Sequence, residues 1–106
     1  MMISENDILR RIKSIVLEKE PSAKIYLYGS RAKGTAKPDS DWDILILLNE
    51  NKITWDIEKN ITYPLYDLEF EIGEVISPLV YSASEWNSKY KVTPFYINVL
   101  REGRML

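Results

Sequence analysis

The sequence contains neither cysteine nor histidine. The first absence excludes disulfide bonds, thiolate nucleophiles and zinc–sulfur sites, and the second excludes imidazole bases, catalytic triads and histidine-bound metals. Any catalysis must therefore use carboxylates, hydroxyls, lysine, arginine and a hard cation such as Mg²⁺. Long hydrophobic stretches are also lacking, because the longest unbroken apolar run is Ile44 to Leu48, whereas a membrane-spanning helix needs about 20 residues.

A large excess of charge of one sign is missing as well. The 106 residues include 14 Lys and Arg and 16 Asp and Glu, which gives a formal net charge of −2. This balance does not indicate nucleic-acid binding through bulk charge. Apolar residues make up 45% and charged residues 28% of the chain, as is typical of globular domains. Because the first residues show no basic or apolar leader region, we expect one cytoplasmic domain spanning residues 1–106, with no membrane association.

The spacing of apolar residues predicts a mixture of helices and strands. Ser4 and Asp7 resemble a capping box for a first helix, which Pro21 ends. The run from Ile44 to Leu48 indicates a strand buried on both faces. The other expected elements are strands at 24–28, 41–48 and 75–81, a helix over 57–72 that Pro64 kinks or divides, a short helix at 85–90, a helix from Pro94 to Gly103 and an edge strand at 104–106. This order predicts an α+β (mixed α/β) fold, with a small, mostly mixed sheet of three to four strands and helices packed on it.

The most informative stretch runs from Gly29 to Asp43. Asp41 and Asp43 are two residues apart where a strand begins, so their carboxylates project from the same face, with Cα atoms about 6–7 Å apart. Such a pair can hold one or two hard cations. Trp42, between them, faces the opposite side, where we expect it to pack in the core.

The start of this stretch is suited to phosphate. Gly29 and Ser30 follow a strand where a helical turn can open, and free N–H groups at such a turn bind phosphate oxygens. Arg31, Lys33 and Lys37 add positive charge close to the glycine. Arg31 is either a phosphate contact or a surface cation. Phosphate and a divalent metal are the ligands that this arrangement favours.

In these residues the chain resembles the minimal prokaryotic nucleotidyltransferases of the DNA polymerase β superfamily. Their signature is Gly-Ser, a short spacer and Asp-x-Asp entering a strand, present here as Gly29-Ser30 and Asp41-Trp42-Asp43. The resemblance implies a nucleotidyltransferase fold and Mg²⁺-dependent transfer of a nucleotidyl group from a nucleoside triphosphate, with ATP expected, to an acceptor hydroxyl. It implies that Asp41 and Asp43 bind Mg²⁺ and act in catalysis, and that Gly29, Ser30, Arg31 and Lys33 bind the nucleotide.

The resemblance also implies a third carboxylate, on the strand after the second long helix. In this sequence that position falls near Ser77 or Pro78, neither of which is acidic. The nearest acids are Glu71 and Glu74, and we take Glu74 as the candidate for the third catalytic acid.

The missing acid leaves a second class of function open. The chain would then be a nucleotide-binding module with little or no activity, acting as antitoxin or regulatory subunit of a HEPN-type helical partner, as the resemblance implies for small members of the family. The aromatic-rich helices of so short a chain predict such a partner or a homo-oligomer.

Overall fold

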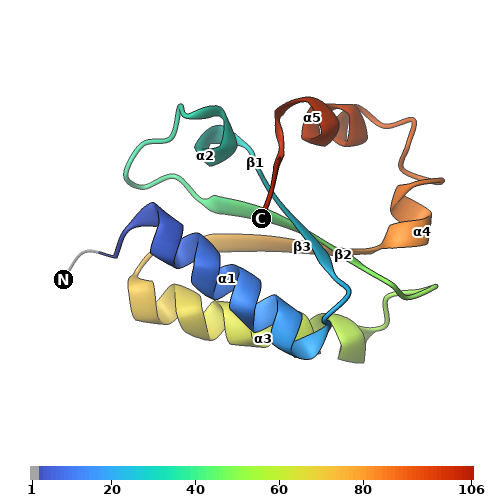
Figure 1. Ribbon diagram of the computed structural model, residues 1–106, viewed down its shortest axis with the longest axis horizontal. Helices are drawn as coiled ribbons and strands as arrows, with labels where there is room; N and C mark the ends of the chain where they lie inside the picture. The colour runs from blue at the N-terminus through green and yellow to red at the C-terminus, as the bar shows by residue number, and fades with distance from the viewer. Residues whose placement is uncertain (1–2) are drawn as a thin grey trace.

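The computed structural model describes residues 3–106 (Figure 1). Its elements are α1 (Glu5–Lys19), β1 (Lys24–Tyr28), α2 (Ser30–Lys33), β2 (Trp42–Leu48), α3 (Trp55–Ile72), β3 (Ile76–Ser82), α4 (Ala83–Trp86), α5 (Pro94–Glu102) and β4 (Arg104–Met105). The strands form one four-stranded sheet in the order β3-β2-β1-β4. β2 and β3 are parallel, whereas β1 is antiparallel to both β2 and β4. The expected α+β fold with a small mixed sheet is therefore confirmed.

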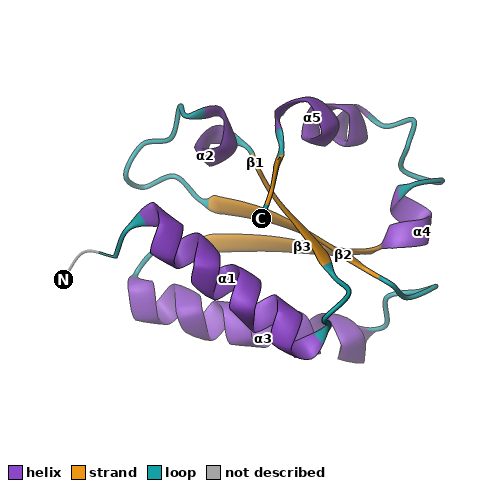
Figure 2. Ribbon diagram, viewed as in Figure 1, coloured by secondary structure: helices purple, strands orange, loops and turns teal. Residues whose placement is uncertain are grey.

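Helices cover both faces of this sheet (Figure 2). Side chains of α1 and α3 pack with Ile44, Ile46 and Leu48 of β2 in the larger apolar core. The intervening Leu45 and Leu47 pack on the other face with side chains of α4 and α5. β2 is thus buried on both sides, as its uninterrupted apolar run predicts. No helix within residues 3–106 is both long enough and apolar enough to cross a membrane.

The first cap of α1 and the last cap of α3 form where the sequence places them. Pro64, which was expected to kink or divide α3, does not divide it. The Ser4 hydroxyl accepts a hydrogen bond from the Asp7 amide at 3.1 Å, and Gly73 ends α3 with a φ of 72°. Pro64 lies inside an undivided α3, so the expectation that it splits the helix is wrong. Proline removes one helical hydrogen bond, while the burial of Ile61 and Leu65 on either side of it stabilises both halves of the helix against the core.

The short helix after β3 begins earlier than the sequence predicts. The Ser82 hydroxyl accepts from the Glu85 amide at 3.3 Å, so Ser82 caps α4 directly at the end of the strand. α4 therefore spans Ala83–Trp86 in place of the expected 85–90. The expected C-terminal edge strand is confirmed as β4, which pairs with the middle of β1.

Candidate functional site

The two aspartates of the motif lie at the N-terminal end of β2, between its neighbouring strands. Asp43 is in register with Tyr28 of β1 and with Ser77 of β3. Residues paired across neighbouring strands point to the same face, so Asp43 points to the face that carries α4 and α5. The Ser77 hydroxyl donates to the Asp41 carboxylate at 3.4 Å. Asp41 therefore lies beside Ser77, the residue in register with Asp43.

The charges at this pair are suited to a divalent cation. Burial, together with the negative charge of Asp41, raises the pKa of the Asp43 carboxyl above its ordinary value. Within residues 3–106 no lysine or arginine forms an ion pair with either aspartate. Two close carboxylates that repel each other and have no protein cation beside them fit a hard metal ion. Within residues 3–106, no group of three or more His, Cys, Asp or Glu side chains is placed to hold a metal ion.

Gly29 brings the backbone of the β1–α2 turn against this pair. Its φ of 74° and ψ of −158° lie in a region that only glycine adopts without strain. A Cβ atom at this position would overlap Oδ2 of Asp43. Glycine is therefore required here both by the backbone conformation and by the approach of the carboxylate. Ser30 follows as the first residue of α2.

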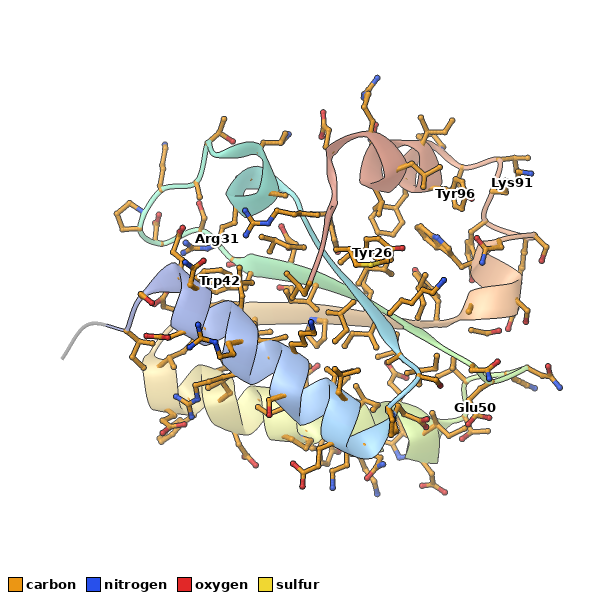
Figure 3. All side chains as sticks on the ribbon, in the orientation of Figure 1. Tyr26, Arg31, Trp42, Glu50, Lys91 and Tyr96 are labelled. Atoms are coloured by element: carbon orange, nitrogen blue, oxygen red, sulfur yellow. The ribbon has the colours of Figure 1, made fainter. Side chains whose placement is uncertain are left out.

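Arg31 supports the loop that leads to the aspartates (Figure 3). Its side chain is only 5% exposed. Its Nε and Nη2 atoms donate to the Ser40 carbonyl at 3.0 and 2.8 Å, and Nη2 also lies 3.2 Å from Oε1 of Glu74. The guanidinium stacks on Trp42, 4.0 Å from the ring centroid. These contacts hold the segment before Asp41 in place, and the low exposure of the side chain shows that Arg31 is not a surface cation.

Glu74 does not join the two aspartates. Its Oε1 accepts from the indole N–H of Trp42 at 3.0 Å as well as from Arg31. Trp42 is buried in the core with α1 and α3, on the face opposite to Asp43. The role of third catalytic acid is therefore not supported for Glu74, because its carboxylate holds Arg31 and Trp42 in place.

The register of β3 identifies the position that a third acid would occupy. Pro78 is in register with Ile44, which faces the larger core, whereas Ser77 is in register with Asp43. Ser77 therefore occupies the place beside the two aspartates where a third carboxylate would lie. Sequence alone left the choice between these neighbours open, because one residue of register separates the two faces.

Two further residues at the site were not singled out by sequence reasoning. Burial, the charge of Asp43 and the neighbouring Tyr81 raise the pKa of Tyr28 to about 12. Tyr28 therefore stays protonated beside the carboxylate. Glu102, near the end of α5, lies 3.7 Å from the ammonium of Lys33. In the sequence, only the position of Tyr28 directly before Gly29 pointed to this site. No sequence pattern pointed to Glu102.

The chain matches the model of the nucleotidyltransferase domain over residues 9–102. This span covers most of the sequence and includes both halves of the motif, so the protein belongs to the nucleotidyltransferase domain family. A comparison with curated proteins gave no match.

Solved structures with the same fold come from toxin–antitoxin complexes. The chain resembles one from a toxin–antitoxin crystal structure with AMP-PNP, with a TM-score of 0.65 and 20% identity over 91% of this chain and 69% of the other. A second similar structure is a Tyr-to-Ala variant of the toxin–antitoxin MntA–HpeT, with a TM-score of 0.60 and 18% identity over 99% and 72% of the two chains. A third is a variant of the same complex with two Asp-to-Glu substitutions two positions apart, with a TM-score of 0.64 and 17% identity over 97% and 72%. At these identities the likeness establishes the fold.

Proposed function

We propose that this protein binds a nucleoside triphosphate, with ATP as the first candidate, together with Mg²⁺, and transfers its nucleotidyl group to an acceptor hydroxyl. The observation that carries the proposal is the pair Asp41 and Asp43, directed to one face of the sheet with Asp43 against the Gly29 turn. Asp41 and Asp43 would hold Mg²⁺, which when bound neutralises phosphate charge and favours displacement at phosphorus. Gly29, Ser30 and Lys33 would contact the triphosphate.

The residues at the site support nucleotide binding more strongly than they support rapid nucleotidyl transfer. In the transfer, the acceptor oxygen bonds to the α-phosphorus, pyrophosphate leaves, and the hydroxyl proton must pass to a base. A positioned base contributes about 10²–10⁴-fold to the rate of such reactions. Ser77, beside the aspartates, cannot take this proton, and Glu74 is held on the other face. We therefore expect transfer by the isolated chain to be slow.

Replacing Asp41 and Asp43 together by asparagine tests nucleotide binding. We expect Mg²⁺-dependent affinity for ATP, measured by calorimetry, to fall by more than about tenfold, because both charged metal ligands are lost. The melting temperature without Mg²⁺ should not fall, since the substitution also removes the repulsion between the carboxylates.

Asp39→Asn is the matched control, because Asp39 is an exposed acid in the same loop that we do not place among the metal ligands. Its affinity should equal that of the wild type. The proposal is wrong if the wild type gives no heat with millimolar ATP or GTP, with and without Mg²⁺, or if the double variant binds as tightly as the wild type.

A second candidate function is regulation of a protein partner, and a surface feature of α3 favours it. Trp55, Tyr63, Tyr66 and Phe70 follow helical spacing on the face turned away from the core, and they are 63%, 50%, 45% and 91% exposed. We call these four residues the α3 aromatic stripe. An exposed apolar patch of this kind typically marks a protein interface. Since the similar structures come from toxin–antitoxin complexes, we propose a HEPN-type helical toxin as the partner, with this protein as its antitoxin.

The double substitution Trp55→Ser and Phe70→Ser tests this function. The wild type, co-expressed with the product of the neighbouring gene, should elute as a complex in size-exclusion chromatography with light scattering, and the double variant should not. Large aromatic residues supply much of the energy of protein interfaces. Val92→Ser is the control, because Val92 is 85% exposed but lies outside α3. A monomeric wild type in the co-expressed sample, or a complex that survives the double substitution, would count against the stripe.

A further inference from the structure

A small cavity lies directly beside the candidate phosphate-binding turn. Its volume is about 170 Å³, and it is lined by Gly29 and Lys33 on one side and by Phe95, Asn98 and Glu102 of α5 on the other. Drug-sized ligands occupy pockets of about 300–1,000 Å³. This cavity is therefore large enough for one heterocyclic ring system but not for a whole nucleotide.

The cavity and the aspartates share one face of the sheet. Tyr28, in register with Asp43, also lines the cavity. Gly29 forms part of its wall and lies against Asp43. A ligand whose phosphates lie at the aspartates can thus extend past Gly29 into the cavity without crossing the sheet.

The side chains of α5 in this cavity have the chemistry that a planar polar ring requires. Phe95, Asn98 and Glu102 are three and four residues apart, so they lie on one face of the helix. The ring of Phe95 makes edge-to-face contacts with Tyr28 and Trp86, with ring centroids 5.2 and 5.5 Å apart. These contacts hold it in a fixed orientation. Such a ring offers an apolar surface on which a base can stack.

Two polar groups complete the wall with opposite hydrogen-bonding character. The Asn98 carbonyl oxygen accepts from Arg101 at 3.2 Å, which leaves the amide N–H groups as the donors that Asn98 can offer a ligand. The Glu102 carboxylate, oriented by Lys33 at 3.7 Å, can only accept hydrogen bonds when ionised. A donor next to an acceptor matches the edge of a nucleobase, where an acceptor and a donor are adjacent.

We propose that this cavity binds the base of the nucleoside triphosphate, with Asn98 and Glu102 as the residues that contact its edge. The proposal rests on the proposed function, because the phosphates are assigned to the adjacent aspartates. It assigns α5, which lies outside the Gly-Ser and Asp-x-Asp motif, to nucleotide binding. In the same assignment, the three donors of the Lys33 ammonium serve both parts of the nucleotide, because Lys33 contacts the triphosphate and also pairs with the Glu102 carboxylate at the cavity.

Two ligands that differ by the nucleoside separate this inference from the proposed function. ATP carries the base, whereas inorganic tripolyphosphate offers only the phosphates, and both are titrated by calorimetry with Mg²⁺ into the wild type and into Asn98→Ala and Glu102→Gln. We expect the ratio of the ATP affinity to the tripolyphosphate affinity to fall about tenfold in each variant, as for the loss of one well-made hydrogen bond. Ile97→Ala, at an exposed neighbouring position of α5 that does not line the cavity, should keep the wild-type ratio.

An unchanged ratio in both variants, with circular dichroism showing intact folds, would place the base elsewhere and overturn the inference while the proposed function stands. Equal affinities of the wild type for ATP and tripolyphosphate would overturn it as well. If the wild type binds neither ligand, the proposed function fails and this inference fails with it.

Discussion

Alanine in place of Gly29 is expected to abolish Mg²⁺-dependent nucleotide binding. The new Cβ would overlap the Asp43 carboxylate, so either this carboxylate or the turn has to move. The backbone at φ 74° and ψ −158° is strained for any residue with a Cβ, by about 1–3 kcal/mol. The free energy of unfolding in urea should fall by at least this amount, and calorimetry with Mg²⁺ and ATP should show no saturable heat.

Gly34→Ala is the matched control for this result. Gly34 also has a positive φ, 75°, but no atom lies within 4 Å of the position its Cβ would take. This variant should lose about 1–2 kcal/mol of stability from the left-handed backbone and still bind the nucleotide. If both variants bind ATP as the wild type does, the contact between the turn and Asp43 has no part in the site. If both lose binding equally, backbone strain alone explains the effect.

A carboxylate at position 77 is expected to increase nucleotidyl transfer. Ser77 is in register with Asp43 and hydrogen-bonded to Asp41, so Ser77→Asp would add a third acid beside the pair. This acid supplies either a further metal ligand or a base for the acceptor hydroxyl. We expect transfer from radiolabelled ATP, assayed with the co-expressed partner as acceptor, to rise by about 10²–10⁴-fold over the slow wild-type rate.

The same substitution should change stability in a way that identifies its cause. Three adjacent carboxylates repel one another, so the melting temperature of Ser77→Asp should fall below that of the wild type without Mg²⁺. Mg²⁺ should restore it, since a ligand that binds only the folded state stabilises that state. Ser77→Asn is the control, because asparagine has nearly the shape of aspartate but no charge. It should show neither the faster transfer nor this Mg²⁺ dependence.

Robust transfer by the wild type would show that Asp41 and Asp43 suffice and that no third acid is needed. A rate for Ser77→Asp equal to a slow wild-type rate, with nucleotide binding intact, would favour the regulatory function over the enzymatic one.

The sequence by itself determined the order of the elements and the core of the candidate site. Helical and strand periodicities are local, and the side of an element on which a residue lies follows from its spacing alone. For this reason Trp42 could be placed opposite Asp41 and Asp43, and β2 could be recognised as buried on both faces. The lack of histidine and cysteine restricts any catalysis to carboxylates, hydroxyls, lysine, arginine and a hard metal, because composition does not depend on how the chain folds.

Only the tertiary structure decided which distant residues meet at this site. Arg31 and Glu74 are 43 positions apart, and their pairing depends on how α2, the loop before β2 and the end of α3 pack together. The choice of Ser77 over Pro78 depends on the register between β2 and β3, and a shift by one residue would exchange their faces. The cavity at α5 exists because that helix packs on the face of the sheet to which Asp43 points. Local sequence patterns carry no information on these contacts, because strand register and helix packing are set by the fold as a whole.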